Sequence, residues 1–260
     1  MSHTDPDVII IGSGAGGGAA AWRFASRGIS VRVLEAGQRY DPARDYKQDK
    51  PDWETPFPAK SDATSPYIVA PLQTLDARHD DLRSWSAVNG PYVTGNIRAN
   101  FGYHHVRGVG GSSLQFTGEA HRLNPKSMKM HSDYGVAADW PVDYQVLQPY
   151  YGIAETVVGV AGDADHDRRC PREDAFPLPA HPHSYASAQL ATGARNLGFH
   201  PVPNALAVLS RPYDQRGPCN YCGGCQRGCM RGDKGSVDLT YLKKAEATGN
   251  CEIMTGVEVL

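Results

Sequence analysis

The stretch that decides the fold lies near the amino terminus and reads VIIIGSGAGG, residues 8–17. Its first four residues are β-branched and end at a glycine, which predicts a strand buried on both faces of a parallel sheet. Small residues then favour a helix over 15–26 that packs closely on this sheet. Apolar and polar residues alternate over 29–35, which predicts a second strand. The sequence therefore predicts the opening βαβ unit of an α/β, Rossmann-like fold.

The turn between the first strand and the helix contains the pattern G-x-G-x-x-G, formed by Gly12, Gly14 and Gly17. Gly12 permits a tight turn, Gly14 lets a pyrophosphate approach the backbone, and Gly17 allows the helix to pack against the strand. Glu35 closes the second strand, where a carboxylate accepts hydrogen bonds from ribose hydroxyls and repels a 2′-phosphate. The pattern predicts FAD or NAD rather than NADP, and its place at the amino terminus favours FAD.

Composition excludes several other classes of protein. The chain has 260 residues, enough for one large domain or two modest ones. Its 26 Lys and Arg against 28 Asp and Glu give a net charge of −2, and no like-charged run indicates nucleic-acid binding. The apolar runs are too short to cross a bilayer, and we expect the chain to carry no export signal of its own. We expect a cytoplasmic protein, with export alongside a partner as the alternative.

The chain divides into five segments by motif and composition. These are the βαβ unit at 1–40, a surface excursion at 41–106, a glycine-rich segment with helices at 107–160, a loop and helix at 161–215, and a cysteine-rich loop, helix and return strand at 216–260. Within them we expect a helix through 149–157 with Pro149 in its first turn, a helix from Ser184 to Gly198, a helix over 239–245, and a closing strand through 253–259.

Four of the six cysteines crowd into one short segment. They form the pattern C-x2-C-x2-C-x3-C, as Cys219, Cys222, Cys225 and Cys229. This is the spacing of ferredoxin loops, in which thiolates wrap an iron-sulfur cluster, although Met230 stands where ferredoxins have proline. A plain cysteine-rich loop, disulfides or a zinc site are the alternatives.

Several segments together resemble one family, the glucose-methanol-choline (GMC) oxidoreductases. They are Asp7 to Gly37, Arg107 to Gly118, Asp139 to Pro141, Pro149 to Tyr151, and Lys234 to Leu242. Nearly all of the chain is similar to the amino-terminal half of these flavoproteins, within the branch of sugar and gluconate dehydrogenases. The resemblance implies an FAD-dependent enzyme that oxidises CH–OH groups of sugars, sugar acids or other alcohols by hydride transfer to flavin.

The resemblance also implies which residues contact FAD. The second glycine-rich segment would line the flavin and its diphosphate, and the backbone of the strand ending near Val259 would contact adenine. Leu114 and Gln115 stand where some relatives carry a histidine linked to FAD, so non-covalent binding is expected. The predicted FAD-binding residues are Gly12, Gly14, Ala15, Gly16, Gly17, Glu35, Ala36, Gly110, Gly111, Ser112, Phe116, Thr117, Gly118 and Val259.

The family's catalytic histidine lies in its carboxyl-terminal half, and none of the ten histidines here matches its motif. We therefore assign no catalytic residue and expect a fragment, incomplete at the carboxyl end and inactive alone. The expected partners are an alcohol or sugar substrate, a small subunit, and a cytochrome or quinone that accepts electrons through the cluster. Nucleic acid and a transmembrane segment are not expected. The alternative function is a non-catalytic FAD and iron-sulfur electron carrier.

Overall fold

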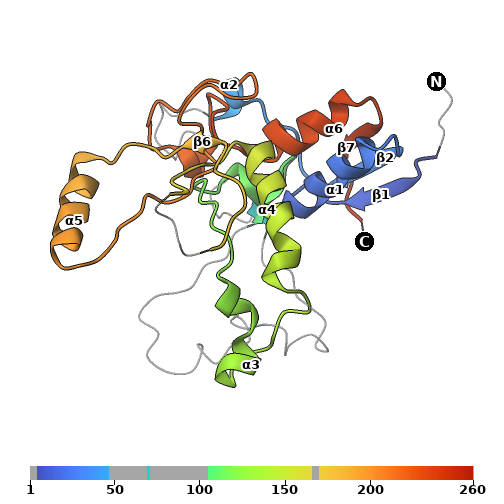
Figure 1. Ribbon diagram of the computed structural model, residues 1–260. Helices are drawn as coiled ribbons and strands as arrows, with labels where there is room; N and C mark the ends of the chain where they lie inside the picture. Colours follow the sequence, from blue (N-terminus) through green and yellow to red (C-terminus); the bar gives the residue numbers. More distant parts are fainter. Residues whose placement is uncertain (1–4, 47–68, 71–104, 166–169, 260) are drawn as a thin grey trace, which may run out of the picture.

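The computed structural model describes residues 5–46, 69–70, 105–165 and 170–259. A three-stranded parallel sheet in the order β1-β2-β7 lies at one side of the molecule (Figure 1). Its strands are β1 (Val8–Ile11), β2 (Val31–Glu35) and β7 (Cys251–Thr255). The predicted α/β fold with a Rossmann-like βαβ opening is confirmed.

Helix α1 (Ala15–Ala25) covers one face of this sheet and packs beside the π-helical turn η7 (Asp238–Leu242) and α6 (Lys243–Ala247). Ala21 and Ala25 are almost fully buried, because small side chains let the helix backbone approach the strands. The rings of Trp22 and Tyr241 meet edge to face, with centroids 5.6 Å apart. The main core contains Ala21, Ala25, Val31, Val33, Val109, Val157, Val237, Tyr241, Leu242 and Ala245.

The remaining elements are short apart from two helices. They are α2 (Pro42–Asp45), β3 (Val69–Ala70), β4 (His105–Val106), η4 (Gly111–Leu114), η5 (Pro125–Met128), α3 (Met130–Tyr134), α4 (Tyr144–Val158), β5 (Ala161–Gly162), β6 (Leu178–Pro179), α5 (Tyr185–Asn196) and η6 (Cys225–Arg227). Most of the predicted excursion at 41–106 lies outside the described residues.

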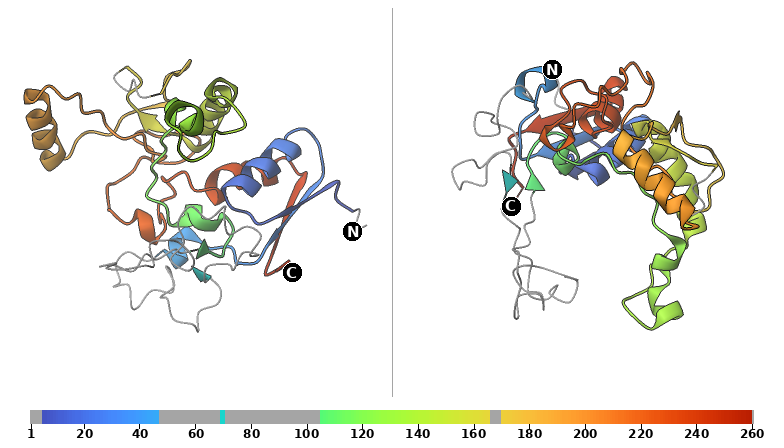
Figure 2. Two further views of the ribbon diagram at one scale, coloured as in Figure 1. Left: turned by 90° about the horizontal axis from the view of Figure 1, so that it is seen from below. Right: turned by 90° about the vertical axis from the view of Figure 1, so that its left-hand side faces the viewer.

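The two longer helices test the sequence predictions differently. Helix α5 begins and ends as expected: the Ser184 hydroxyl accepts a hydrogen bond from the N–H of Ser187, and Gly198 follows with a positive φ. Figure 2 shows α5 standing away from the sheet. Placing Pro149 in the first turn of its helix was wrong, because α4 begins at Tyr144 and Pro149 lies in its interior. Proline has no N–H, so α4 lacks one internal hydrogen bond there.

Two expectations about the sheet were also wrong. Strand β1 is not buried on both faces, since Ile9 and Ile11 are 59% and 68% exposed. Among the described residues β1 pairs with β2 alone, and α1 covers the opposite face. The closing strand ends at Thr255, because Gly256 turns the chain with a positive φ of 71°. Val259 therefore lies beyond the strand.

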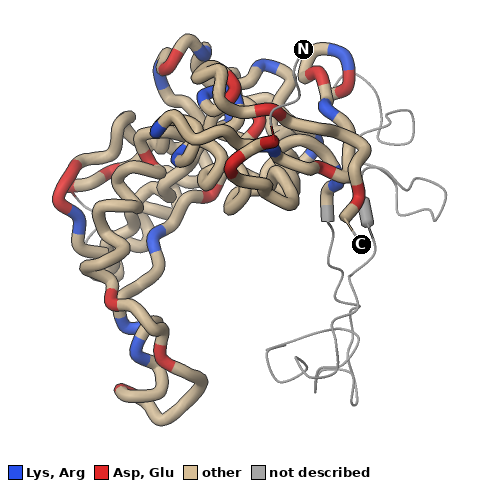
Figure 3. Tube along the Cα trace, turned by 90° about the vertical axis from the view of Figure 1, so that its right-hand side faces the viewer, with Lys and Arg blue, Asp and Glu red and all other residues tan. Residues whose placement is uncertain are grey.

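No helix in the described part of the chain is long and apolar enough to span a membrane. Along the trace in Figure 3, Lys and Arg are interspersed with Asp and Glu rather than gathered on one face. Exposed ion pairs contribute to this mixture, among them Arg32 with Glu252 and Arg39 with Glu246. Such pairs add little stability, so packing around the sheet is the main stabilising term.

Replacing Gly17 by Ala is expected to destabilise the protein by about 1–3 kcal/mol or more. An added Cβ would lie 2.0 Å from the carbonyl oxygen of Gly12, so the backbone of the loop or the helix must move. Gly193→Ala in α5 is the matched control, because nothing lies within 4 Å of its Cβ position. That change should be neutral or stabilising by up to ~1 kcal/mol. Urea unfolding curves of both variants measure the difference, and equal midpoints would contradict the close packing at Gly17.

Candidate functional site

The first glycine loop leaves its backbone open to a ligand. Gly12 has a φ of 83°, and Gly14 is the residue that precedes the first turn of α1. Nothing lies within 4 Å of a Cβ built on Gly14, and Ala15 and Gly16 are exposed. The first N–H groups of a helix have no partner within it and attract negative charge. The loop therefore fits a diphosphate group, as the G-x-G-x-x-G pattern predicted.

The carboxylate of Glu35 is buried and holds this loop in place. Its Oε2 accepts hydrogen bonds from the Ser13 N–H at 2.9 Å and the Ser13 hydroxyl at 2.6 Å. Its Oε1 accepts one from the Gly37 N–H at 2.8 Å. The predicted ribose contact of Glu35 stays a prediction, because a carboxylate can accept further hydrogen bonds. Ser13 was not among the predicted site residues, because it occupies a variable position of the glycine motif.

The second glycine-rich segment lies directly against the first. A Cβ on Gly111 would come within 2.8 Å of the Gly14 Cα, so the two backbones are in contact. The Gly110 N–H donates to the Ser13 hydroxyl at 3.0 Å, which connects this segment to Glu35. The structure thus brings together two segments that the resemblance places around one cofactor, although about a hundred residues separate them in the sequence.

The other predicted FAD contacts are more scattered. Phe116 packs beside Val160 and Ala207 in a separate apolar cluster, and Thr117 is exposed. Gly118 is buried and packs against Val208. Ala36 follows β2 directly, whereas Val259 is 45% exposed beyond the end of β7. Contact of these residues with FAD stays a prediction.

Lys234 is a buried cation that was not among the predicted site residues. Its side chain is fully buried, and its Nζ donates to the carbonyl oxygens of Leu114 and Phe116 at 2.9 Å and of Cys225 at 2.7 Å. Burial lowers the pKa of Lys234 to about 8. Lys234 therefore connects the end of the second glycine-rich segment to the cysteine loop.

The cysteine loop does not gather its thiols in this structure. Cys222 is exposed, and the Cys229 thiol is buried and donates to Asp233 Oδ1 at 2.9 Å. Burial and this carboxylate raise the pKa of Cys229 to about 11. Across the described residues, no three His, Cys, Asp or Glu side chains converge closely enough to hold a metal ion. The iron-sulfur site stays a sequence prediction that this arrangement does not fit.

Replacing Gly14 by Ala is expected to weaken FAD binding by about tenfold or more, while lowering the free energy of unfolding of the FAD-free protein by only about 1 kcal/mol or less, since Gly14 caps α1. The methyl group meets no protein atom but fills the space beside the helix amino terminus, where a diphosphate would approach. Titration of the FAD-free protein with FAD, followed by flavin fluorescence, gives the dissociation constants. Gly193→Ala serves again as the control, and an unchanged FAD affinity in Gly14→Ala would remove the loop from the site.

Lys234→Met is expected to destabilise the protein by about 1–3 kcal/mol near neutral pH, because three buried carbonyl groups lose their donor. The stability of the wild type relative to Lys234→Met should rise from pH 8 to pH 10.5. In this window the unfolded chain keeps the lysine proton and the folded chain has lost it, since burial lowers the folded pKa to about 8 from the ordinary 10.5. Urea unfolding of both proteins across this pH range tests the sign, and a falling difference would contradict it.

Comparisons with known proteins agree with this site. A family model described as "FAD binding domain" matches residues 7–43, which contain the first glycine loop and Glu35. The chain is similar to the fructose dehydrogenase large subunit of Gluconobacter japonicus, at 32% identity over 86% of this chain and 40% of that protein. It is also similar to the gluconate 2-dehydrogenase flavoprotein of Pantoea cypripedii, at 27% identity over 98% of this chain and 44% of that protein.

A solved structure of a fungal aryl-alcohol oxidase has the same fold, with a TM-score of 0.50, 17% identity, and coverage of 97% of this chain and 39% of that one. The chain thus spans about two-fifths of the length of the curated relatives named above. The family match supports FAD as the cofactor. The resemblance to the GMC-type oxidoreductases that the sequence motifs indicated is confirmed over nearly the whole chain.

Proposed function

We propose that this chain forms the FAD-binding portion of an oxidoreductase that oxidises a CH–OH group of a sugar, a sugar acid or a related alcohol. The observation that carries the proposal is the contact between Gly14 and Gly111, which sets two cofactor-binding segments around one open helix terminus. The similarity to a fructose dehydrogenase subunit and a gluconate dehydrogenase flavoprotein supports the substrate class. Bound FAD would supply the hydride acceptor for this reaction.

The residues of the chain have binding roles in this proposal. The amino terminus of α1, with Gly14 before it, offers N–H groups and a favourable dipole to the diphosphate. The turn from Gly110 to Ser112 and the ring of Phe116 would border the flavin. Attachment is non-covalent, since Leu114 and Gln115 offer no histidine to FAD.

We assign no catalytic residue. Among the described histidines, the ring nitrogens of His181 face the Tyr221 hydroxyl and the Val208 carbonyl oxygen, and His121 lies 3.7 Å from a Glu119 carboxylate oxygen. None of the three interactions involves a residue of the two glycine-rich segments. In this proposal the residues of the chain bind and orient FAD. The group that takes the proton from the alcohol is not assigned to any residue of the chain.

The route of the electrons is part of the same proposal. A cytochrome or quinone accepts them, with a small subunit as a further partner, and the compartment is the cytoplasm unless a partner exports the protein. We route no step through an iron-sulfur cluster, because among the described residues no three Cys, His, Asp or Glu side chains come together to hold a metal ion. For the same reason no observation favours the alternative of a non-catalytic FAD and iron-sulfur carrier.

The full-length protein should be yellow and should release unmodified FAD on denaturation, because binding is non-covalent. Under anaerobic conditions, fructose or gluconate should bleach the flavin absorbance, whereas a simple NAD-linked enzyme would show no flavin. Iron and acid-labile sulfide are measured on the same sample. Absence of flavin overturns the proposal, and flavin that neither sugars nor alcohols reduce overturns the substrate class. Stoichiometric iron with sulfide would restore the cluster as the electron route.

A further inference from the structure

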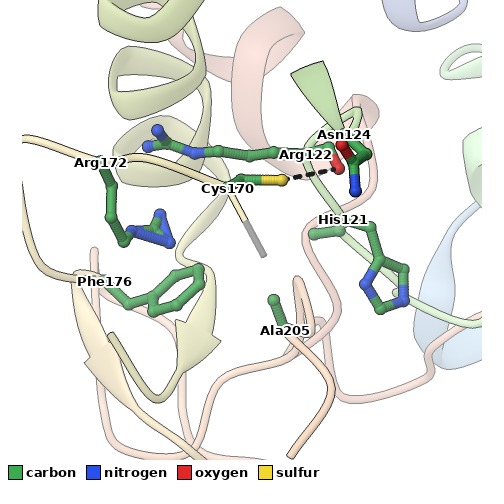
Figure 4. A pocket seen from close by; sticks show the side chains of 8 residues that line it. His121, Arg122, Asn124, Cys170, Arg172, Phe176 and Ala205 are labelled. Carbon is green, nitrogen blue, oxygen red and sulfur yellow. Dashed lines mark hydrogen bonds between the residues drawn. The ribbon is translucent and has the colours of Figure 1, made fainter. Parts of the chain in front are cut away.

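A pocket of about 170 Å³ lies between the chain after the second glycine-rich segment and the loop that follows α4 (Figure 4). Its walls come from 120–124 on one side, 170–176 on the other, and Ala205. None of the predicted FAD-binding residues lines it. It is lined by Ala120, His121, Arg122, Asn124, Cys170, Arg172, Phe176 and Ala205. The pocket is therefore separate from the glycine loops, and an inference about it does not rest on the proposed function.

Two arginines that line the pocket share one carboxylate. Arg122 donates to both carboxylate oxygens of Glu155, from Nε to Oε1 at 2.7 Å and from Nη2 to Oε2 at 2.8 Å. Arg172 donates from its own Nη2 to Glu155 Oε2 at 2.6 Å. All three side chains are at most 10% exposed. Two guanidinium groups and one carboxylate leave one positive charge uncompensated within this buried group, and buried charge is costly unless it is paired.

Most of the free donor capacity of this group lies on Arg172. Arg122 uses nearly all of its donors, because besides its two bonds to Glu155 its Nη1 donates to the Pro171 carbonyl oxygen and the Tyr144 hydroxyl. Arg172 uses Nε for the Asp174 carbonyl oxygen and one amino group for Glu155. Within the described part of the chain its other amino group has no hydrogen-bond acceptor. Figure 4 shows the Arg172 guanidinium at the wall of the pocket, beside the ring of Phe176.

The rest of the wall combines donors with apolar surface. His121 and Asn124 stand on the side opposite Arg172, and no Asp or Glu side chain lines the pocket. Phe176 and Ala205 supply an apolar surface, and the centroid of the Phe176 ring lies 3.5 Å from the Arg172 guanidinium carbon. The volume is close to the ~150 Å³ of a cavity that holds one benzene-sized molecule. Such a wall fits a small organic molecule with one negatively charged end.

We propose that this pocket binds a small monocarboxylate, with the carboxylate on Arg172 and the carbon chain against Phe176 and Ala205. A single negative charge matches the single uncompensated positive charge of the Arg122, Glu155 and Arg172 group. A carboxylate on a guanidinium forms charge-assisted hydrogen bonds, which are about twice as strong as neutral ones. A doubly charged phosphate would exceed the available charge and leave the apolar wall uncovered.

Butyrate binding to the full-length, FAD-loaded protein tests the proposal, with uncharged butyramide as the matched probe. Calorimetric titration should give saturable binding of butyrate to one site, and butyramide should bind about tenfold more weakly or not at all. Inorganic phosphate is titrated in parallel. Equal affinity for butyrate and butyramide overturns the proposal, and tighter binding of phosphate than of butyrate at this site overturns the choice of a monocarboxylate.

Arg172→Met should weaken butyrate binding by about tenfold or more, because it removes the donor and leaves Arg122 and Glu155 as a neutral pair. Arg195→Met is the control, since Arg195 is exposed on α5 and does not line the pocket. Unchanged butyrate affinity in folded Arg172→Met overturns the proposal.

A measurement on the wild type covers the case in which Arg172→Met does not fold. The Cys170 thiol lines the pocket, so saturating butyrate should slow its alkylation by iodoacetamide several-fold. Exposed Cys222 serves as the internal reference, and its rate should not change. Mass spectrometry of peptides follows both sites. Equal alkylation rates of Cys170 with and without butyrate contradict binding in this pocket.

Discussion

The hydrogen-bonded pair of Glu35 and Ser13 is the interaction on which the rest of the structure depends. One carboxylate at the end of β2 accepts from the N–H and the hydroxyl of Ser13 and from the N–H of Gly37, and the Ser13 hydroxyl accepts from the N–H of Gly110. These bonds hold both glycine-rich segments against the end of the sheet. A buried carboxylate is costly unless its oxygens accept hydrogen bonds. The buried position of Glu35 therefore depends on the first glycine loop, and the loop depends on Glu35 for partners of its N–H and hydroxyl groups.

Two other buried charges connect segments in a similar way. Lys234 gathers three carbonyl oxygens from the second glycine-rich segment and the cysteine loop, and Glu155 on α4 holds two arginines from separate loops. Much of the described chain beyond the sheet has little regular secondary structure, and its backbone groups need partners other than helix or strand neighbours. Buried ions with several hydrogen bonds supply those partners and give the loops fixed positions.

The βαβ unit could be predicted because its signals are local. A run of β-branched residues, a glycine turn and an alternating strand act over a few positions, and β1, α1 and β2 follow them closely. Predictions that depend on a distant partner were less reliable. Pro149 was misplaced because α4 begins earlier, at Tyr144, whose hydroxyl donates to the Pro171 carbonyl oxygen of a distant loop. The spacing of the cysteines, likewise, does not state whether their sulfur atoms face one another.

The residues alone were sufficient for the α/β class, the place of the first glycine loop, and the resemblance to the GMC oxidoreductases, because each follows from short-range pattern and spacing. Only the tertiary structure placed Gly111 on Gly14, gave Glu35 its bonds to Ser13, and set Arg122 and Arg172 around one carboxylate. Those contacts join residues far apart in the chain. Their geometry depends on close packing of many side chains and on the pairing of buried charge, which no local pattern encodes.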